Sequence, residues 1–317
     1  MKTLFIEERG SAINYERSVL LIYKQGVRVA SVPLKSLERV VLSPSVTIEA
    51  GVMGVLMLHR IDLLVFNSRF PERCAMLLGR EPRSAHRRVA QYEMHSDAEL
   101  RASYAHRLIY LKLQGQRRLA RRIAKARPDL RYEAHQLERH LSKSCNSLIQ
   151  QKSTISLPSL RGVEGAAAAA YFHLYTRVFA KHLGFIKRIK RPPTDPVNVV
   201  LSLTYTMTYH ETISALKGAG LDPCLGFLHE VCAGRESLAG DIMEPVRPMI
   251  DEWVWTLFRA QTLRVEDFKI TSSACKLQPE GKKRFYNAWL KKSKGLRKLL
   301  RRAALLSANE VEEYLHV

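Results

Sequence analysis

Short apolar runs, separated by Gly, Pro or Ser, fill about the first 80 residues of the chain. The runs are TLFIEE, SVLLIYK, VRVASVPL, LERVVLS, IDLLVFN and CAMLLG. Their length and their β-branched residues predict the strands of a small sheet or sandwich. The longer segment IEAGVMGVLMLHR predicts one short helix between the fourth and fifth of these strands.

From about residue 83 the pattern changes to long segments in which apolar residues recur at helical spacing, with few glycines. The segments are HRRVAQYEMHSDAELRASYAHRLIYLKLQGQRRLARRIAKA, YEAHQLERHLSKSCNSLIQQ and GVEGAAAAAYFHLYTRVFAKHL. We therefore predict an α+β protein, with a small β-rich N-terminal domain over residues 1–82 and a larger all-α domain over residues 83–317. A chain of 317 residues, 46% of them hydrophobic, can form two such cores.

The same pattern argues against a membrane-spanning segment. The longest uninterrupted apolar run, Gly51–Leu58, is far shorter than the roughly 20 residues that a spanning helix needs. The start of the chain, MKTLFIEERG, has acids where a signal peptide would be apolar. We expect a globular, cytoplasmic protein with no membrane partner.

Cysteine usage agrees with a reducing compartment. The five cysteines are Cys74, Cys145, Cys224, Cys232 and Cys275. They are odd in number and contain no C-x-x-C pair, so we expect reduced, partly buried thiols. A zinc site made from His229 and the two cysteines on either side of it is disfavoured, because a gap of seven residues between those cysteines is not finger-like spacing.

The charge of the chain is concentrated in its helical part. The net charge is +21, of which residues 1–80, with 11 Lys and Arg against 7 Asp and Glu, contribute +4 and the remainder +17. Any single basic side chain is most simply a solvated helix face, but an excess of this size predicts a polyanion site, with nucleic acid as the leading partner. The tail GKKRFYNAWLKKSKGLRKLLRR has ten basic residues and no acid. Its aromatic residues Phe285, Tyr286 and Trp289 suit nucleic-acid contacts or, equally, the buried stripe of a helix.

Two carboxylates and a histidine stand out in the apolar stretch GFLHEVCAGRESLAGDIMEPVRP. Ser237 is a candidate N-cap for a helix that carries Asp241 and Glu244 on one face, three residues apart. Pro245 should either kink this helix or lie where the helix restarts, and both alternatives keep the carboxylates close together. His229 precedes a Gly-containing loop that should return the chain toward these acids.

A third acid, Glu164, lies in the otherwise small and apolar segment RGVEGAAAAAYF. We expect it in the first turns of a helix, where the helix N-terminus favours a carboxylate and where Gly162 and Gly165 permit close approach of another backbone. Burying this charge would cost several kcal/mol unless a cation or metal pairs with it. Two carboxylates and an imidazole would suit Mn²⁺ or Mg²⁺ better than structural zinc.

Four motifs then make the sequence recognisable. RGVEGAAAAAYF, DPVNVVLSLTY, GLDPCLGFLHEV and SLAGDIMEPVRP resemble, in order and spacing, the core motifs of the CRISPR-associated endonuclease/integrase ("Cas one") family. The N-terminal strand runs and the later FKITSSACKLQPEGKKRFYNAW are also similar to that family, so the resemblance covers nearly the whole chain.

This resemblance implies a metal-dependent DNA endonuclease/integrase that inserts short foreign DNA segments into a CRISPR array. It implies Glu164, His229 and Glu244 as the ligands of Mg²⁺ or Mn²⁺, with Asp241 as a supporting group or as the ligand in place of Glu244. The implied partners are double-stranded DNA and a small ferredoxin-like subunit. Strand edges and a low net charge in the β-rich domain also predict a homodimer formed chiefly through that domain.

Basic residues near these motifs are candidates for DNA binding. They are Arg161, Lys187, Arg188, Lys190, Arg191 and Arg247. Two other interpretations are weaker. A transposon-encoded integrase of the same fold would need an added DNA-binding module, for which the roughly 70 residues after the Glu244 helix leave little room. A catalytically idle DNA-binding scaffold would not need all three ligand positions to be filled.

Overall fold

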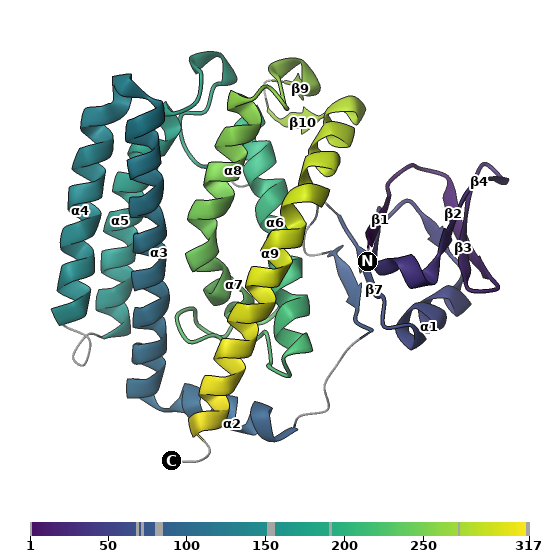
Figure 1. Ribbon diagram of the computed structural model, residues 1–317, viewed down its shortest axis with the longest axis horizontal. Coiled ribbons are helices and arrows are strands. Elements are labelled where there is room, and N and C mark those ends of the chain that lie inside the picture. Colours follow the sequence, from purple (N-terminus) through teal and green to yellow (C-terminus); the bar gives the residue numbers. More distant parts are fainter. Residues whose placement is uncertain are drawn as a thin grey trace. The chain divides into compact units, whose positions relative to one another are not determined.

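The computed structural model describes residues 2–67, 70, 73–79, 85–150, 156–189, 192–271 and 273–314. The chain divides into two compact units, Met1–Ser84 with Lys217–Gly220, and Ala85–Leu216 with Leu221–Val317. A strand-rich N-terminal part followed by a mostly helical remainder confirms the α+β prediction (Figure 1). The predicted domain boundary after residue 82, and the candidate residues Lys190 and Arg191, lie outside the described residues.

Two four-stranded sheets form the N-terminal unit. One has the order β1-β5-β7-β8, with the first three strands parallel, and the other has the order β4-β3-β2-β6. The elements are β1 Lys2–Ile6, β2 Ser11–Glu16, β3 Val19–Lys24, β4 Val27–Pro33, β5 Leu37–Leu42, β6 Thr47–Ile48, helix α1 Ala50–Leu58, β7 Asp62–Val65 and β8 Ala75–Leu77. A short 3₁₀ turn, η1 (Leu34–Ser36), separates β4 from β5.

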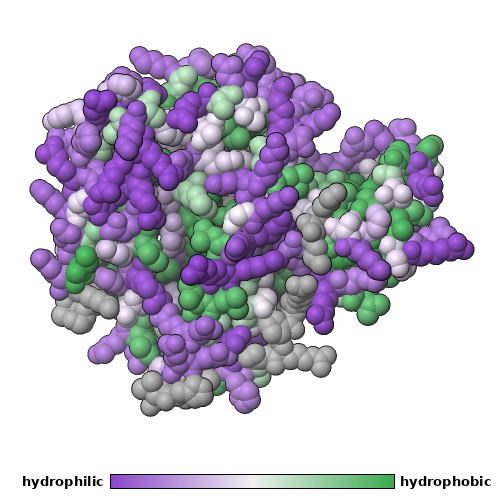
Figure 2. Space-filling model, in the orientation of Figure 1, coloured by the Kyte–Doolittle hydropathy of each residue, from purple (hydrophilic) through white to green (hydrophobic). Residues whose placement is uncertain are grey.

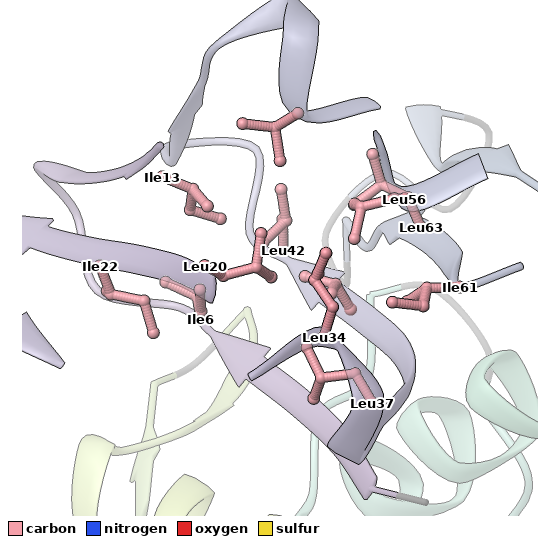
Figure 3. Close-up of a cluster of buried hydrophobic side chains, with 12 residues drawn as sticks. Ile6, Ile13, Leu20, Ile22, Leu34, Leu37, Leu42, Leu56, Ile61 and Leu63 are labelled. Atoms are coloured by element: carbon pink, nitrogen blue, oxygen red, sulfur yellow. The ribbon is translucent and has the colours of Figure 1, made fainter. Parts of the chain in front are cut away.

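Aliphatic side chains from both sheets and from α1 form the core of this unit (Figure 3). Leu20 and Ile22 alternate along β3 toward this core, and Leu56 of α1 belongs to the same cluster and is completely buried. Strand β2 was not predicted, because its sequence SAINYE places only Ile13 fully in the core. The outer strand β4 is almost entirely exposed, including Val27 and Val29.

Long helices build the second unit. They are α2 Ala85–Ser96, α3 Ala98–Ala126, α4 Arg131–Gln150, α5 Leu157–Arg177, α6 Pro196–Gly218, α7 Ser237–Met243, α8 Arg247–Arg259 and α9 Pro279–Tyr314. Short 3₁₀ turns lie at η3 Pro128–Leu130, η4 Lys181–Leu183, η5 Glu244–Val246 and η6 Val265–Asp267, and β9 Phe268–Ile270 pairs with β10 Cys275–Leu277. Helices α3, α4 and α5 lie side by side (Figure 1). The first predicted helical segment is broken at Asp97, whose carboxylate caps α3 by accepting from the backbone N–H groups of Glu99 and Leu100.

The basic tail belongs to α9, and its aromatic residues belong to the core. Phe285 and Trp289 are buried, and Trp253 of α8 packs against both rings. Of the two roles predicted for these aromatics, the buried stripe is therefore the one observed for Phe285 and Trp289. The exposed basic side chains of α9 include Lys282, Lys283, Lys291, Lys294, Lys298 and Arg302. Figure 2 shows hydrophilic side chains over most of the visible face of this helical unit.

No helix among the described residues is both long enough and apolar enough to cross a bilayer. Of the cysteines, Cys145 and Cys275 are buried, whereas Cys224 and Cys232 are exposed, and all five are free thiols.

Candidate active site

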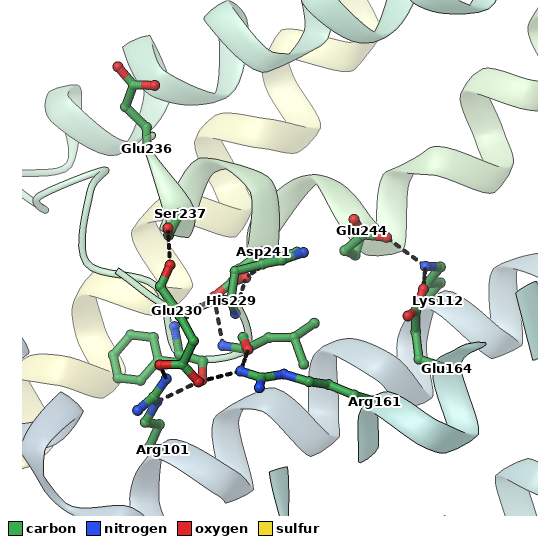
Figure 4. A network of polar contacts seen from close by, with 12 residues as sticks. Arg101, Lys112, Arg161, Glu164, His229, Glu230, Glu236, Ser237, Asp241 and Glu244 are labelled. Atoms are coloured by element: carbon green, nitrogen blue, oxygen red, sulfur yellow. Dashed lines mark hydrogen bonds and ion pairs between the residues drawn. The ribbon is translucent and has the colours of Figure 1, made fainter. Parts of the chain in front are cut away.

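Three segments of the helical unit carry the candidate residues: α5, the loop between α6 and α7, and α7 with its continuation η5 (Figure 4). Glu164 lies on α5, His229 lies in the loop between α6 and α7, and Asp241 lies on α7. Glu244 begins the 3₁₀ turn η5, which connects α7 to α8. The fourth segment, α3, contributes Lys112, which the sequence did not single out.

The chain around Asp241 follows one of the two predicted alternatives. Helix α7 begins at Ser237 and gives way to η5 at Glu244, so Pro245 lies where the chain enters the next helix. This placement costs little, because a proline at the start of a helical turn has no backbone N–H to leave unpaired. Ser237 is not the N-cap as predicted, since Glu236 holds that position, and the Ser237 hydroxyl instead donates to the carbonyl of Glu230 at 2.7 Å.

Asp241 is completely buried and holds the His229 loop in place. Its Oδ2 accepts from the backbone N–H groups of Phe227 at 2.6 Å and Leu228 at 2.9 Å. Its Oδ1 accepts from the backbone N–H of His229 at 3.1 Å and from the ring Nδ1 of His229 at 2.5 Å. These four bonds use the acceptor sites that a carboxylate has, so Asp241 fixes the orientation and tautomer of the imidazole. The other ring nitrogen, Nε2, remains for a ligand role.

One glycine, Gly226, allows the loop and α7 to approach so closely. A Cβ atom at Gly226 would lie 2.7 Å from the side chain of Ser237 and 2.9 Å from the carbonyl oxygen of His229. Any side chain at position 226 would therefore displace the loop from the helix.

Glu164 and Glu244 converge on one cation. The Lys112 ammonium forms an ion pair with Oε1 of Glu164 and lies 2.7 Å from Oε2 of Glu244. Among the described residues, only the contact to Glu164 has the geometry of a hydrogen bond, so the buried Oε2 of Glu244 has Lys112 as its ion-pair partner but no hydrogen bond. The side chains of Lys112 and Glu244 are 8% and 7% exposed, whereas that of Glu164 is 32% exposed. The expectation that Glu164 needs a cation is therefore met by Lys112.

Other expectations for Glu164 were wrong. Helix α5 begins at Leu157, where Ser156 caps it, so Glu164 is beyond the first two turns and out of reach of the helix N-terminus. A Cβ at Gly162 or Gly165 would meet no atom within 4 Å, so among the described residues no backbone approaches there.

Arg247 completes the charge balance around Glu244. Its Nε donates to Oε1 of Glu244 at 2.8 Å, and its guanidinium lies 4.8 Å from the centre of the Tyr205 ring. Burial alone would raise the pKa of Glu244, but the charges of Arg247 and Lys112 outweigh it and lower that pKa to about 2. Glu244 is therefore an anion at neutral pH, although it is buried.

A further buried carboxylate, Asp251, lies next to Arg247. Asp251 accepts hydrogen bonds from the hydroxyl groups of Tyr205 and Tyr171, the latter at 2.7 Å. Burial raises the pKa of Asp251 to about 6, and these hydrogen bonds only partly offset it. Asp251, Tyr205, Arg247 and Glu244 thus form a continuous chain of contacts.

Two arginines, Arg101 and Arg161, also hold the His229 loop in place. Glu230 accepts from Arg101 of α3 at 2.8 Å and from Arg161 of α5 at 2.5 Å, and these bonds lower its pKa to about 2. Arg101 also donates to the carbonyl of Phe227 at 3.0 Å, and Arg161 donates to that of Leu228 at 2.8 Å.

The candidate DNA-binding residues therefore differ in whether their side chains already have partners within the protein. Arg161 and Arg247 have internal partners, and Arg188 donates to Asn198 at 2.8 Å and Ser202 at 3.0 Å. Lys187 is exposed to solvent.

These donors fit a hard divalent cation only in part. Glu164 and Glu244 present carboxylate oxygens to one point, and one of these oxygens lacks a hydrogen bond, as suits Mg²⁺ or Mn²⁺. Among the described residues, however, no three His, Cys, Asp or Glu side chains are close enough to hold a metal as they stand. The obstacle at the carboxylate pair is the Lys112 ammonium. This observation also gives no support to a zinc site at His229.

A sequence signal for Lys112 did exist. The buried face of α3 includes Leu108, Ile109 and Leu113, and Lys112 lies on the same stripe at helical spacing. A lysine at such a position needs a buried anion, and that anion is the candidate site.

Comparison with known proteins identifies the family of this chain. Residues 4–291 match the family described as CRISPR associated protein Cas1. The CRISPR-associated endonuclease Cas1 1 of Thermodesulfovibrio yellowstonii is 35% identical over 288 residues, covering 90% of this chain and 89% of the relative. A Cas4 exonuclease/Cas1 endonuclease fusion of Rhodospirillum rubrum is 30% identical over 88% of this chain, which spans 48% of that relative.

Solved structures share the fold. A Cas1 protein from Thermotoga maritima has a TM-score of 0.79 at 20% identity, with 98% of this chain and 97% of that chain covered. A casposase bound to integration product has the same TM-score and identity, with 98% and 91% covered. A chain of a Cas6-RT-Cas1–Cas2 complex has a TM-score of 0.81 at 22% identity, with 98% of this chain and 35% of that chain covered. The family match and the identity to a full-length relative confirm the predicted resemblance, and this chain belongs to the Cas1 family of CRISPR-associated endonucleases.

Proposed function

We propose that this protein is a metal-dependent integrase that inserts short foreign DNA segments into a CRISPR array. The observation that carries the proposal is the convergence of the Glu164 and Glu244 carboxylates on one point. His229, whose orientation Asp241 fixes, lies on the loop before α7 and supplies the third proposed ligand. A site of this kind gathers oxygen and nitrogen donors for Mg²⁺ or Mn²⁺. The neighbouring casposase is described as bound to an integration product, which supports strand transfer as the reaction type.

In the proposed reaction the 3′-hydroxyl oxygen of the incoming DNA forms a bond to a phosphorus at the repeat boundary. The bond from that phosphorus to the 3′ oxygen of the target strand breaks, and the proton of the attacking hydroxyl is transferred to the departing oxygen by way of solvent. One phosphodiester replaces another, so no covalent protein intermediate and no external energy source are required. A bound divalent ion would stabilise the negative charge that develops on the phosphate oxygens.

The residues of the chain have separate roles in this proposal. Glu164, Glu244 and Nε2 of His229 are the metal ligands. Asp241 is the positioning group, because all its acceptor sites are used within the His229 loop. Arg247 keeps Glu244 ionised and correctly oriented.

DNA phosphates would be bound mainly by exposed basic side chains. Lys187 and the exposed lysines of α9 are free to make such contacts, and the net charge of +17 after residue 80 provides the long-range attraction. Arg161, Arg188 and Arg247 would touch DNA only in addition to their internal contacts, and they act first as structural cations.

The proposed assembly is a homodimer formed through the β-rich unit, joined by a small ferredoxin-like subunit and working in the cytoplasm. The exposed edge strand β4, with Val27 and Val29 open to solvent, supports pairing between two copies. Structures described as Cas6-RT-Cas1–Cas2 complexes support a multi-subunit assembly.

A strand-transfer assay in Mn²⁺ or Mg²⁺ tests the proposal. Glu164→Ala and His229→Ala should each abolish transfer while DNA binding persists, because each removes a metal ligand. Glu280→Ala provides the matched control, since it removes an exposed carboxylate at the start of α9. A thermal melt and a binding titration accompany each variant. Near-parental transfer by either ligand variant would refute the metal site.

The choice of target DNA tests the competing identity. A transposon-encoded integrase should prefer the ends of a mobile element, whereas the proposed function requires preference for a CRISPR repeat boundary. Normal DNA binding without transfer under any metal condition would favour the idle scaffold.

A further inference from the structure

Lys112 lies between the two carboxylates of the candidate site. The proposed roles of the metal ligands do not explain why a lysine occupies this position. Its ammonium lies between the carboxylates of Glu164 and Glu244, which come from different helical segments. An ammonium group has three donors and no lone pair, so it cannot be a metal ligand. It contacts the oxygen atoms that a divalent ion would need.

The charges at this point explain why a cation lies between the two carboxylates. Two carboxylates brought together in a largely buried place repel one another, and burying them unpaired is costly. Lys112 and Arg247 balance Glu164 and Glu244, so the four side chains together carry no net charge. Arrival of a divalent ion would give the group a net charge of +2 if Lys112 stayed in position. The ammonium and the metal ion therefore exclude one another, by charge and by space.

The surroundings offer Lys112 a second position. Gln116 lies one helical turn further along α3, and its buried side-chain oxygen has no hydrogen-bond partner within the described part of the chain. Helical side chains lean toward the N-terminus of their helix, so the side chain of Gln116 leans over the turn that carries Lys112. The surface of α5 is also open at Gly162 and Gly165, which lie on either side of Glu164 in the sequence, since added Cβ atoms there would meet no described atom within 4 Å.

We propose that Lys112 is a resident counter-ion that holds Glu164 and Glu244 together in the metal-free protein and that a divalent metal must displace. Metal binding is then an exchange of one cation for another, and the exchange weakens the apparent affinity for metal. The displaced ammonium donates to Gln116 or moves toward the open side of Glu164. This inference rests on the proposed metal site and adds a residue that regulates it.

The first test compares Mn²⁺ binding by calorimetry in Lys112→Met and in the parent protein, both free of DNA. Methionine keeps an unbranched apolar stem as long as that of lysine up to Cε, but it removes the ammonium group and its competing charge. Its Mn²⁺ affinity should rise on the order of tenfold, a typical size for coupling between two binding events. The same variant should melt at a lower temperature than the parent in chelator, and saturating Mn²⁺ should narrow that difference.

A matched control is available on the same helix. Lys125 is exposed on α3, so Lys125→Met makes the same change in net charge away from the site. It should leave both the Mn²⁺ affinity and the melting temperature in chelator near those of the parent. A folded Lys112→Met protein that binds Mn²⁺ no more tightly than the parent would overturn the inference.

A second measurement needs no substitution at Lys112. Brief acetylation of the parent protein, followed by mass spectrometry, reports how accessible each lysine is. Labelling of Lys112 should increase severalfold at saturating Mn²⁺, whereas labelling of Lys125 should not change. Unchanged labelling of Lys112, in protein shown by calorimetry to hold Mn²⁺, would refute displacement. If the parent binds no Mn²⁺ at all, the proposed metal site itself fails, and the exchange fails with it.

Discussion

Replacing Asp241 by asparagine should damage the His229 loop in a way that can be calculated from its contacts. The carboxylate accepts four hydrogen bonds, two at each oxygen, at distances between 2.5 and 3.1 Å. Asparagine keeps one oxygen and presents an NH₂ group in place of the other, so two donors lose their acceptor in either orientation. Hydrogen bonds to a charged group contribute about 1.5–3 kcal/mol each, which predicts a loss of about 3–6 kcal/mol.

A thermal melt with and without Mn²⁺ measures this loss. For a unit of this size each kcal/mol lowers the melting temperature by about 2–4 °C, so a decrease of at least about 6 °C is expected. The His229 ring also loses the acceptor that fixes its tautomer, and the affinity for metal should fall about 10- to 100-fold. Both effects arise from positioning, because Asp241 has no free acceptor site.

The outcome that would refute this reasoning is specific. If Asp241→Asn melts like the parent but no longer binds Mn²⁺, then Asp241 is itself a ligand and the Glu244 assignment is wrong. Glu230→Gln is the control in the same loop. Its carboxylate is 62% exposed and bridges two arginines, so the loss should be at most about 1 kcal/mol.

Three further predictions concern other parts of the molecule. Val29→Lys on the exposed strand β4 should turn the expected dimer into a monomer, as judged by light scattering, and a parent that is already monomeric at micromolar concentration would contradict the proposed assembly. Parental DNA affinity should fall steeply with salt, and Lys187→Gln should make that fall less steep in a binding titration, whereas a salt slope near zero would rule out phosphate contacts. Burial raises the pKa of Asp251 from 3.8 to about 6, so the folded protein should lose stability as the pH rises through this range, because the unfolded chain ionises first. Asp251→Asn should remove most of that loss in thermal melts between about pH 4 and about pH 7, and an unchanged pH dependence would contradict this assignment.

Periodicity in the sequence was enough to predict most of the fold. The runs that became β3 and β4, and the helix α1, were visible because apolar residues alternate or cluster between strong turn residues. Strand β2 was missed because its sequence, SAINYE, has few apolar residues. It forms a strand because it pairs with β3 and because Ile13 packs in the core. The break at Asp97 could have been found from its capping position before Glu99, but the helical spacing continues through it.

The candidate site was harder to predict from the residues alone. Family resemblance identified the acids and the histidine, but it could not separate the roles of Asp241 and Glu244. That separation depends on which carboxylate receives the backbone N–H groups of the loop, and only the folded chain brings those groups to Asp241. Lys112 was missed for a similar reason, since its two partners lie on segments far away in the sequence.

The ion pairs of Glu230 with Arg101 and Arg161 limit how far the protein could be shortened. A fragment that begins at α5 would keep every residue of the ligand motifs, but it would lose α3, which supplies Arg101 to the His229 loop. The same truncation would uncover Phe227, whose ring stacks on Tyr104 of α3 with centroids 4.3 Å apart. A minimal catalytic module of this protein therefore has to start before α3, and the segment that contains the recognisable motifs should not be transplanted alone into another scaffold.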